Sequence, residues 1–144
     1  MTEPSENAIS RWSEEMRGIQ SLMESGSFDP AAHRLQVLAR EVGSMPGLAA
    51  QKLLPIVLGR LGECHFRAGR LQEAVAPTRQ ALELCRQSGD LESVMAYLGN
   101  LLELSVQLGA TVDAVAIADM LAQNYEQMGM PDRAEKVRER VRNL

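Results

Sequence analysis

Apolar residues recur along most of the chain at the spacing of a helix. One stripe, at positions i, i+4, i+7, i+8 and i+11, consists of Leu54, Leu58, Leu61, Gly62 and His65. A second stripe follows Gly69 and consists of Leu71, Ala74, Val75, Thr78, Ala81, Leu82 and Cys85. Residues at these spacings lie on one face of a helix, and that face is normally buried. The pattern predicts two consecutive amphipathic helices that turn at Gly69.

Three of the expected buried positions in this pair of helices are small. Gly62 lies in the first stripe, and Ala74 and Ala81 lie seven residues apart in the second. Side chains this small let two helix backbones approach closely, so a larger side chain overpacks the contact at a cost of about 1–3 kcal/mol. We therefore expect a helical hairpin whose helices cross at these residues.

Glycines repeat this unit along the chain. They occur at positions 69, 89, 109 and 129, and each step of 20 residues is the length of one helix with its turn. Matching Gly26 to Gly69 places Ala31 on Ala74, so the first 43 residues read as a diverged copy of the hairpin. We predict an all-α chain with hairpins at about 4–43, 48–88 and 90–128, followed by a last helix at about 131–143.

Proline and capping residues set the expected helix limits. In the first hairpin, Asp29 is a good N-cap and Pro30 suits the first position of the second helix. A loop is expected at 43–47, which is rich in turn formers. Pro55 either marks the first turn of the next helix or kinks that helix, and Pro77 is expected to bend the helix that follows.

Composition agrees with a helical fold and limits the partners. The chain has 144 residues, the size of one domain, and its aromatic content is only 3%. Strands draw on aromatic and β-branched residues, so a chain rich in leucine, alanine and methionine favours helices. The net charge of -4 comes from a mixed surface without a basic excess, which argues against nucleic acid as a ligand. We find no apolar run of membrane-spanning length and no secretory signal, so we expect a cytoplasmic protein without a membrane partner.

The two cysteines are expected to be buried free thiols. Cys64 and Cys85 lie where the helical stripes place small buried residues, and a reducing cytosol keeps thiols unpaired. A disulfide between them is the alternative. Metal binding is not supported, because Cys64 and His65 are adjacent and point about 100° apart on a helix. A structural zinc site needs four ligands at paired short spacings, so we expect no metal and no cofactor.

The hairpin at 58–86 resembles the tetratricopeptide repeat, whose signature runs W-x2-L-G-x2-Y and then A-x3-F, A and P. The residues that carry the likeness are Leu58, Leu61, Gly62 and His65 in the first helix and Ala74, Thr78 and Ala81 in the second. Leucine replaces the tryptophan, histidine replaces the tyrosine, and Arg86 stands where the final proline is usual. A unit of about 40 residues is similar to the long-repeat class of this family. The resemblance implies one domain over 1–144, a right-handed α-solenoid of about three antiparallel hairpins with a C-terminal capping helix.

The resemblance also implies a binding face, the concave groove that the first helices line and that holds a peptide or helix of another protein. In each first helix the residues opposite the buried stripe are spaced four, three and four apart. The expected partner-binding residues on this face are Arg17, Gln20, Arg60, Glu63, Phe66, Arg67, Asn100, Glu103 and Gln107. Arginine forks suit a carboxylate, and Asn100 offers a donor and an acceptor to a peptide backbone. The alternative is a set of solvated helix faces with pairs such as Glu63 with Arg60 or Arg67.

A second surface is expected near the end of the chain. Flexible thioethers suit adaptable protein contacts, and Met128 and Met130 flank the turn at Gly129, where we expect them to be exposed. Met95 and Met120 are expected in the core instead. The candidate oligomer interface consists of Met128, Met130, Val137 and Val141. Through it the chain would form a homodimer.

The sequence contains no nucleophile elbow, phosphate-binding loop or metalloprotease helix, so we expect no catalytic residues and no enzyme activity. The leading prediction is an adaptor that binds a peptide or helix of another protein. One alternative is a scaffold that assembles with itself through its last helix. Another is a regulatory sensor of a small ligand or signalling peptide, for which a closed polar pocket would be the mark.

Overall fold

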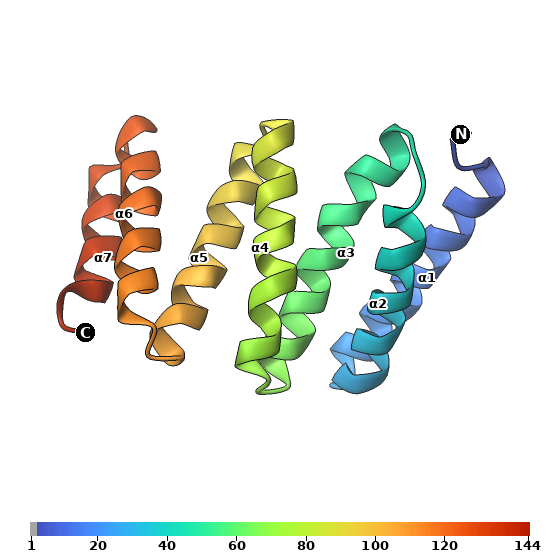
Figure 1. Cartoon of the computed structure of the whole chain (residues 1–144), viewed down its shortest axis with the longest axis horizontal. Helices are drawn as coiled ribbons and strands as arrows, with labels where there is room; N and C mark the ends of the chain where they lie inside the picture. The colour runs from blue at the N-terminus through green and yellow to red at the C-terminus, as the bar shows by residue number, and fades with distance from the viewer. Residues whose placement is uncertain (1–2) are drawn as a thin grey trace. The chain divides into compact units, whose positions relative to one another are not determined.

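All regular elements in the described part of the chain, residues 3–144, are helices (Figure 1). The computed structural model has seven of them there and no strand, which confirms the all-α prediction. They are α1 (Glu6–Glu24), α2 (Phe28–Gly43), α3 (Leu48–Arg67), α4 (Leu71–Ser88), α5 (Leu91–Gln107), α6 (Thr111–Gln127) and α7 (Pro131–Arg142).

Glycine in the left-handed region ends the helices at the predicted turns. At the end of α3, Gly69 has φ 81° and its N–H donates to the carbonyl of Phe66, while the N–H of Arg70 donates to the carbonyl of His65. These two bonds satisfy carbonyls that the helix leaves free, and the backbone conformation they need is one that glycine adopts without a steric penalty. Positive φ values recur at Gly26, Gly89, Gly109 and Gly129, so the spacing of 20 residues reflects a repeated chain reversal.

The described chain divides into two compact units, and the division falls within α4, between Ala81 and Leu82. In the first unit, α2 packs against both α1 and α3. Its core joins side chains from all three of these helices and contains Trp12, Ile19, Met23, Leu35, Leu38, Val42, Val57, Leu61 and Cys64. The amphipathic stripes that predicted the helices thus supply the packing of this unit.

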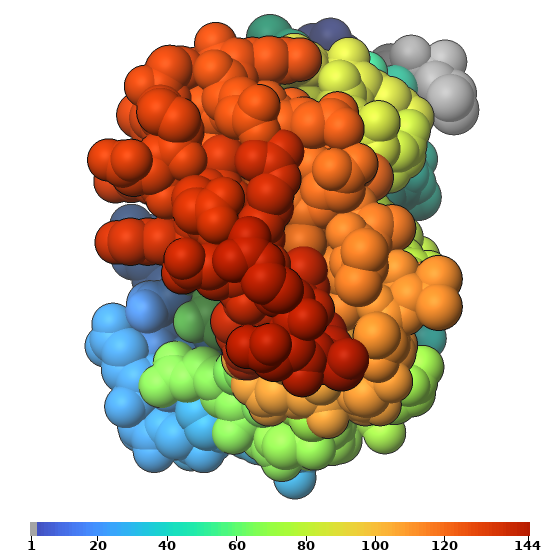
Figure 2. Space-filling model, turned by 90° about the vertical axis from the view of Figure 1, so that its left-hand side faces the viewer, coloured from blue at the N-terminus to red at the C-terminus, as the bar shows by residue number. Residues whose placement is uncertain are grey.

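The second unit comprises Leu82–Leu144, and within it α6 packs against both α5 and α7. The face of α6 that meets them carries Ala114, Ala118 and Ala122 at four-residue spacing, each no more than 1% exposed. Small side chains let helices lie close together, and α7 covers its neighbour through Ala134, which is also 1% exposed. Figure 2 shows α7, in red, beside α6, in orange, on the face turned to the viewer.

The predicted close crossing in the central hairpin is confirmed. A Cβ added at Gly62 of α3 would overlap the hydroxyl of Thr78 in α4 and would lie 3.4 Å from the backbone oxygen of Ala74. That hydroxyl is itself held, because it donates to the Ala74 carbonyl at 2.8 Å. Glycine at position 62 therefore lets α3 meet α4 at this point.

One predicted helix limit was wrong. Helix α2 begins at Phe28 with Ser27 at its N-cap position, so Asp29 is not the cap and Pro30 is the third residue of the helix, within its first turn. Proline is tolerated there because the first N–H groups of a helix have no intrahelical partner in any case. Helix α3 begins at Leu48, as the predicted limit of the second hairpin requires, and of the two alternatives for Pro55 the first-turn position is excluded because Pro55 lies within the helix. Likewise, α4 continues through Pro77.

Candidate functional site

The predicted binding residues of α3 lie at the surface and pair with one another. Arg60 Nη1 donates to Glu63 Oε2 at 3.3 Å, and Arg67 Nη1 lies 3.8 Å from the other carboxylate oxygen of Glu63. The guanidinium of Arg67 also covers the ring of Phe28 in α2, 4.9 Å from its centroid. The structure thus brings Arg60, Glu63 and Arg67 together in the intrahelical pairs of a solvated helix face, while the ring of Phe66 is half-buried.

Helix α1, in the same unit, carries Arg17 and Gln20, and both side chains are exposed. Gln20 donates to Glu24 at 3.2 Å, again within one helix. The guanidinium of Arg17 has no ion-pair partner among the described residues. Arg17 is therefore the predicted cation on this unit that remains available to an incoming group.

The predicted residues of α5 belong to the second unit. Asn100 and Gln107 are exposed, and Glu103 is half-buried. Glu103 accepts hydrogen bonds from Gln107 at 3.2 Å and from Arg140 of α7 at 3.0 Å. These hydrogen bonds lower the pKa of Glu103. Glu103 thus links α5 to α7, which leaves Asn100 as the freer recognition group.

The candidate oligomer surface is partly open in the structure. Met128 and Met130 are 43% and 37% exposed, and Val137 and Val141 of α7 are half-buried. All four side chains lie close in sequence to Ala134, the residue through which α7 is buried. Whether a second copy covers this surface stays a prediction.

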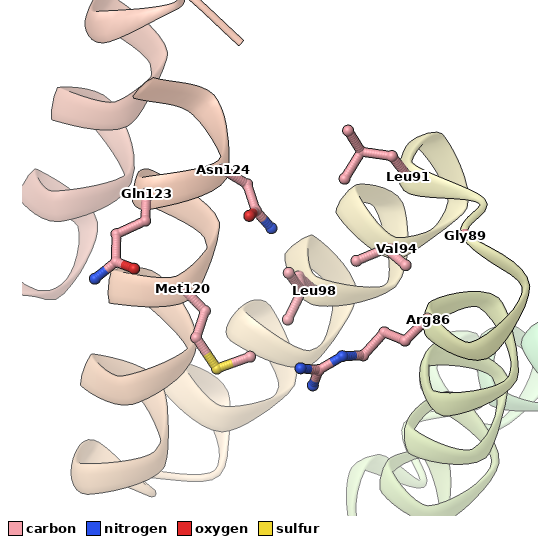
Figure 3. Close-up of a pocket in the computed structure, with 8 residues that line it drawn as sticks. All are labelled: Arg86, Gly89, Leu91, Val94, Leu98, Met120, Gln123 and Asn124. Carbon is pink, nitrogen blue, oxygen red and sulfur yellow. The ribbon is translucent and has the colours of Figure 1, made fainter. Parts of the chain in front are cut away.

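The second unit also contains a cavity of about 310 Å³ that the sequence did not predict (Figure 3). It lies between the last turn of α4, the first half of α5 and the second half of α6. We call it the α4–α6 cavity, and its lining residues are Arg86, Gly89, Leu91, Val94, Leu98, Met120, Gln123 and Asn124. Leu98 and Val94 are buried, whereas Leu91 and Met120 are 48% and 38% exposed. The cavity therefore has a buried apolar base, and exposed apolar side chains border its opening to solvent.

Met120 was expected in the core and lines this cavity instead. Helix α6 uses its alanines as the buried face, and Met120 lies outside that row, on the side of the helix that borders the cavity. Periodicity alone does not separate the two positions, because a side chain beside a buried stripe and one within it differ by a single step around the helix. Met95, by contrast, is buried as predicted.

Polar groups enter the α4–α6 cavity from two helices. Figure 3 shows Arg86 extending from α4 toward the space that Met120 and Asn124 border on α6. Gln123 donates its amide N–H to Asp119 at 3.0 Å. Arg86 forms no ion pair within the described part of the chain. The one sequence feature that marked Arg86 was its position, where the repeat usually has proline. The spacing of residues along the chain did not relate Arg86 to the residues of α6.

His65 is a buried neutral ring in the structure. Its Nδ1 accepts a hydrogen bond from Arg70 Nε at 3.0 Å, and the side chain is 9% exposed. Burial, followed by the positive charge of Arg70, lowers the pKa of His65. The carboxylate of Glu73 lies 3.7 Å from the same nitrogen, but it opposes this shift without reversing it. His65 therefore acts as a hydrogen-bond acceptor that helps to hold the turn after α3.

We expect the free energy of unfolding to fall as the pH drops below 6.5, the ordinary pKa of histidine. The folded chain binds a proton at His65 less readily than the unfolded chain does. The contribution of the neutral ring to stability is therefore fully present above this pH and decreases as the pH falls below it. Denaturation of the wild type and of His65→Gln, which keeps an acceptor but cannot titrate, measures the effect between about pH 7.5 and 5.5. An equal pH dependence in both proteins would contradict the neutral role of His65.

The cysteines are free and buried, and burial raises the pKa of both Cys64 and Cys85. They are thus thiols rather than thiolates at neutral pH. Across residues 3–144, no three histidine, cysteine or acidic side chains gather as metal ligands would. No helix in that range has both the length and the apolar character needed to cross a membrane.

The described surface therefore offers two kinds of candidate recognition site, the polar faces of the first helices within each unit and the α4–α6 cavity within the second unit. The first consists mainly of satisfied ion pairs, and the second joins an unpaired guanidinium to an apolar base. Comparisons of this chain with protein-family models, curated proteins and solved structures gave no match.

Proposed function

We propose that this chain is a non-catalytic, tetratricopeptide-like α-solenoid adaptor that binds a peptide or helix of another protein. The observation that carries the proposal is the exposure of Arg17 and Arg60 on α1 and α3 of the first unit and of Asn100 on α5 of the second. An arginine fork recognises a carboxylate, and an asparagine amide recognises both a backbone N–H and a backbone carbonyl. A polypeptide presents all of these groups.

The carboxylates on these faces also favour recognition over catalysis. Glu63 lies between Arg60 and Arg67, and Glu103 is bound by Gln107 and Arg140. A general acid or base needs a carboxyl group whose pKa lies near the working pH in a sheltered site. The hydrogen bonds from Gln107 and Arg140 lower the pKa of Glu103 instead, and a charged carboxylate is suited to hold a partner's cation or N–H group.

The experiment that tests the proposal is a selection of binders from a random-peptide phage library on the immobilised chain. Peptides selected on the wild type are then titrated against the double variant Arg60→Glu with Asn100→Ala. We expect affinity to fall by about tenfold or more, which corresponds to about 1.4 kcal/mol or more of binding free energy. Melting should remain nearly unchanged, because both side chains are exposed.

A matched control separates site-specific loss from a general charge effect. Arg40→Glu reverses a charge in the last turn of α2, at an exposed position outside the first-helix faces. Peptide binding should survive this change. Equal affinity of a selected peptide for the wild type and the double variant would reject the first-helix faces as its site, and failure to select any peptide would reject the proposed function.

A second candidate function, self-assembly, rests on the open surface at the end of the chain. Met128 and Met130 are exposed there beside the half-buried valines of α7. Light scattering after size exclusion should then show a dimer that Val137→Asp with Val141→Asp dissociates, because buried carboxylates are costly at an apolar interface. A monomer at every concentration would remove this candidate.

A further inference from the structure

We propose that the α4–α6 cavity binds a segment of a partner protein in which a large apolar side chain lies next to an aspartate or glutamate. The inference rests on the proposed function and makes it specific, because it names the chemistry of the partner and gives it a site apart from the first-helix faces. Three features of the cavity carry it: an unpaired cation, an apolar base with exposed rims, and amides on the opposite wall.

The cation is exceptional among the arginines of the second unit. Arg138, Arg140 and Arg142 each pair with a glutamate, and Arg133 lies over the ring of Tyr125, 6.0 Å from its centroid. Arg86 alone has neither kind of partner among the described residues. Its guanidinium extends into the cavity from α4 (Figure 3). A planar fork of donors in this position is suited to bind a carboxylate through two parallel hydrogen bonds.

The apolar part of the cavity is suited to a single anchoring side chain. Its volume of about 310 Å³ is at the lower end of the range for ligand pockets, about 300–1,000 Å³. Leu98 and Val94 form the buried base, and Leu91 and Met120 form exposed rims. Covering exposed apolar surface is favourable, at about 25 cal/mol for each Å² removed from water. A leucine, methionine or phenylalanine side chain would fit within this space beside Arg86 and leave room for the adjacent acidic side chain.

The opposite wall sets the polarity of the bound segment. Gln123 gives its amide N–H to Asp119, which leaves its carbonyl oxygen to accept from a backbone N–H. Asn124 is half-buried and offers both a donor and an acceptor. Because Asp119 puts a negative charge on this side, the acidic group of the partner is favoured at Arg86, on the α4 side.

The surface beside the cavity favours a polypeptide over a small acid. The exposed face of α6 continues with Val112 and Val115, which are 84% and 46% exposed. Val112, Ala116 and Met120 follow one i, i+4, i+8 ridge of the helix, so this apolar surface adjoins the rim of the cavity. A small amphiphile would fill the cavity and leave the ridge in water, whereas a peptide segment would cover both.

The test compares phage selections on the wild type, on Arg86→Gln and on Arg40→Gln as a matched control at another exposed helix end. We expect the wild type and the control to enrich peptides with a large apolar residue adjacent to an aspartate or glutamate. Arg86→Gln should lose this motif. For a synthetic copy of an enriched peptide, we expect about tenfold weaker binding to Arg86→Gln and no further loss there when its acid is replaced by the amide.

Other outcomes overturn the inference in distinguishable ways. Enrichment of the same motif on Arg86→Gln, or loss of binding only in the Arg60 and Asn100 double variant, would reject this cavity and leave the proposed function standing. Dodecanoate that perturbs the Asn124 amide in NMR spectra and displaces no selected peptide would indicate a small-amphiphile site instead. Concentration-dependent shifts of the same amide without any ligand would indicate a second copy of the chain. No enriched peptide at all would reject both proposals.

Discussion

Replacing Leu101 by alanine is expected to lower the free energy of unfolding by about 2–5 kcal/mol. Leu101 is 3% exposed in α5, so the substitution removes buried apolar surface and leaves a cavity in the second unit. A loss of this size is a large part of the 5–15 kcal/mol that typically stabilises a domain. Chemical denaturation followed by circular dichroism measures it, and Leu61→Ala, at 7% exposure, makes the same test in the first unit.

Leu108→Ala is the matched control, since it removes the same atoms at the C-cap of the same helix. Leu108 is 37% exposed, so the expected loss is about 0.5 kcal/mol or less. Comparable losses for Leu101→Ala and Leu108→Ala would show that the buried stripe of α5 is wrongly assigned. Wild-type stability of Leu101→Ala would show the same.

Gly62→Ala and Gly99→Ala are expected to change stability in opposite directions, although both replace a glycine inside a first helix. A Cβ at Gly62 would overlap the hydroxyl of Thr78, whereas one at Gly99 meets nothing within 4 Å. Alanine favours a helix over glycine by about 0.5–1 kcal/mol. Overpacking at Gly62 costs about 1–3 kcal/mol, so that variant should be destabilised and Gly99→Ala stabilised.

The cause of the Gly62 effect can be isolated with a double-mutant cycle. Thr78→Ala removes the hydroxyl that the new Cβ would meet, and it also removes the bond from that hydroxyl to the Ala74 carbonyl. In the Thr78→Ala background, Gly62→Ala should therefore lose most of its cost. Destabilisation of the same size in both backgrounds would assign the effect to something other than this contact.

Much of the fold could be predicted because its signals are local. Helical spacing identified the buried stripes, and glycine at regular intervals identified the turns, since both depend on residues a few positions apart. The close crossing at Gly62 followed from small residues on both stripes. The start of α2 was not predicted, because Asp29 has the residue type of an N-cap but lies inside the helix, where its carboxylate accepts a hydrogen bond from Arg70, far along the chain.

The candidate sites likewise combine features that local spacing predicts with features that depend on tertiary packing. That Arg17, Arg60 and Asn100 lie on exposed faces follows from the period of each helix, and so does the pairing of Glu63 with its neighbours on α3. The link between Glu103 and Arg140 does not, because the two residues are 37 positions apart and meet only when α7 packs in the second unit.

Residue spacing alone was enough to predict the helices, most of their limits and the buried face of each, because these follow from interactions between residues close in the chain. That Leu91, Leu98 and Met120 border a cavity with Arg86 depends on the packing of the helices and could not be predicted from spacing. Those residues come from three helices, and the space between them depends on how the helices pack. The same packing places Glu126 beside Arg138 and Glu103 beside Arg140, and it leaves Arg86 without an ion-pair partner among the described residues.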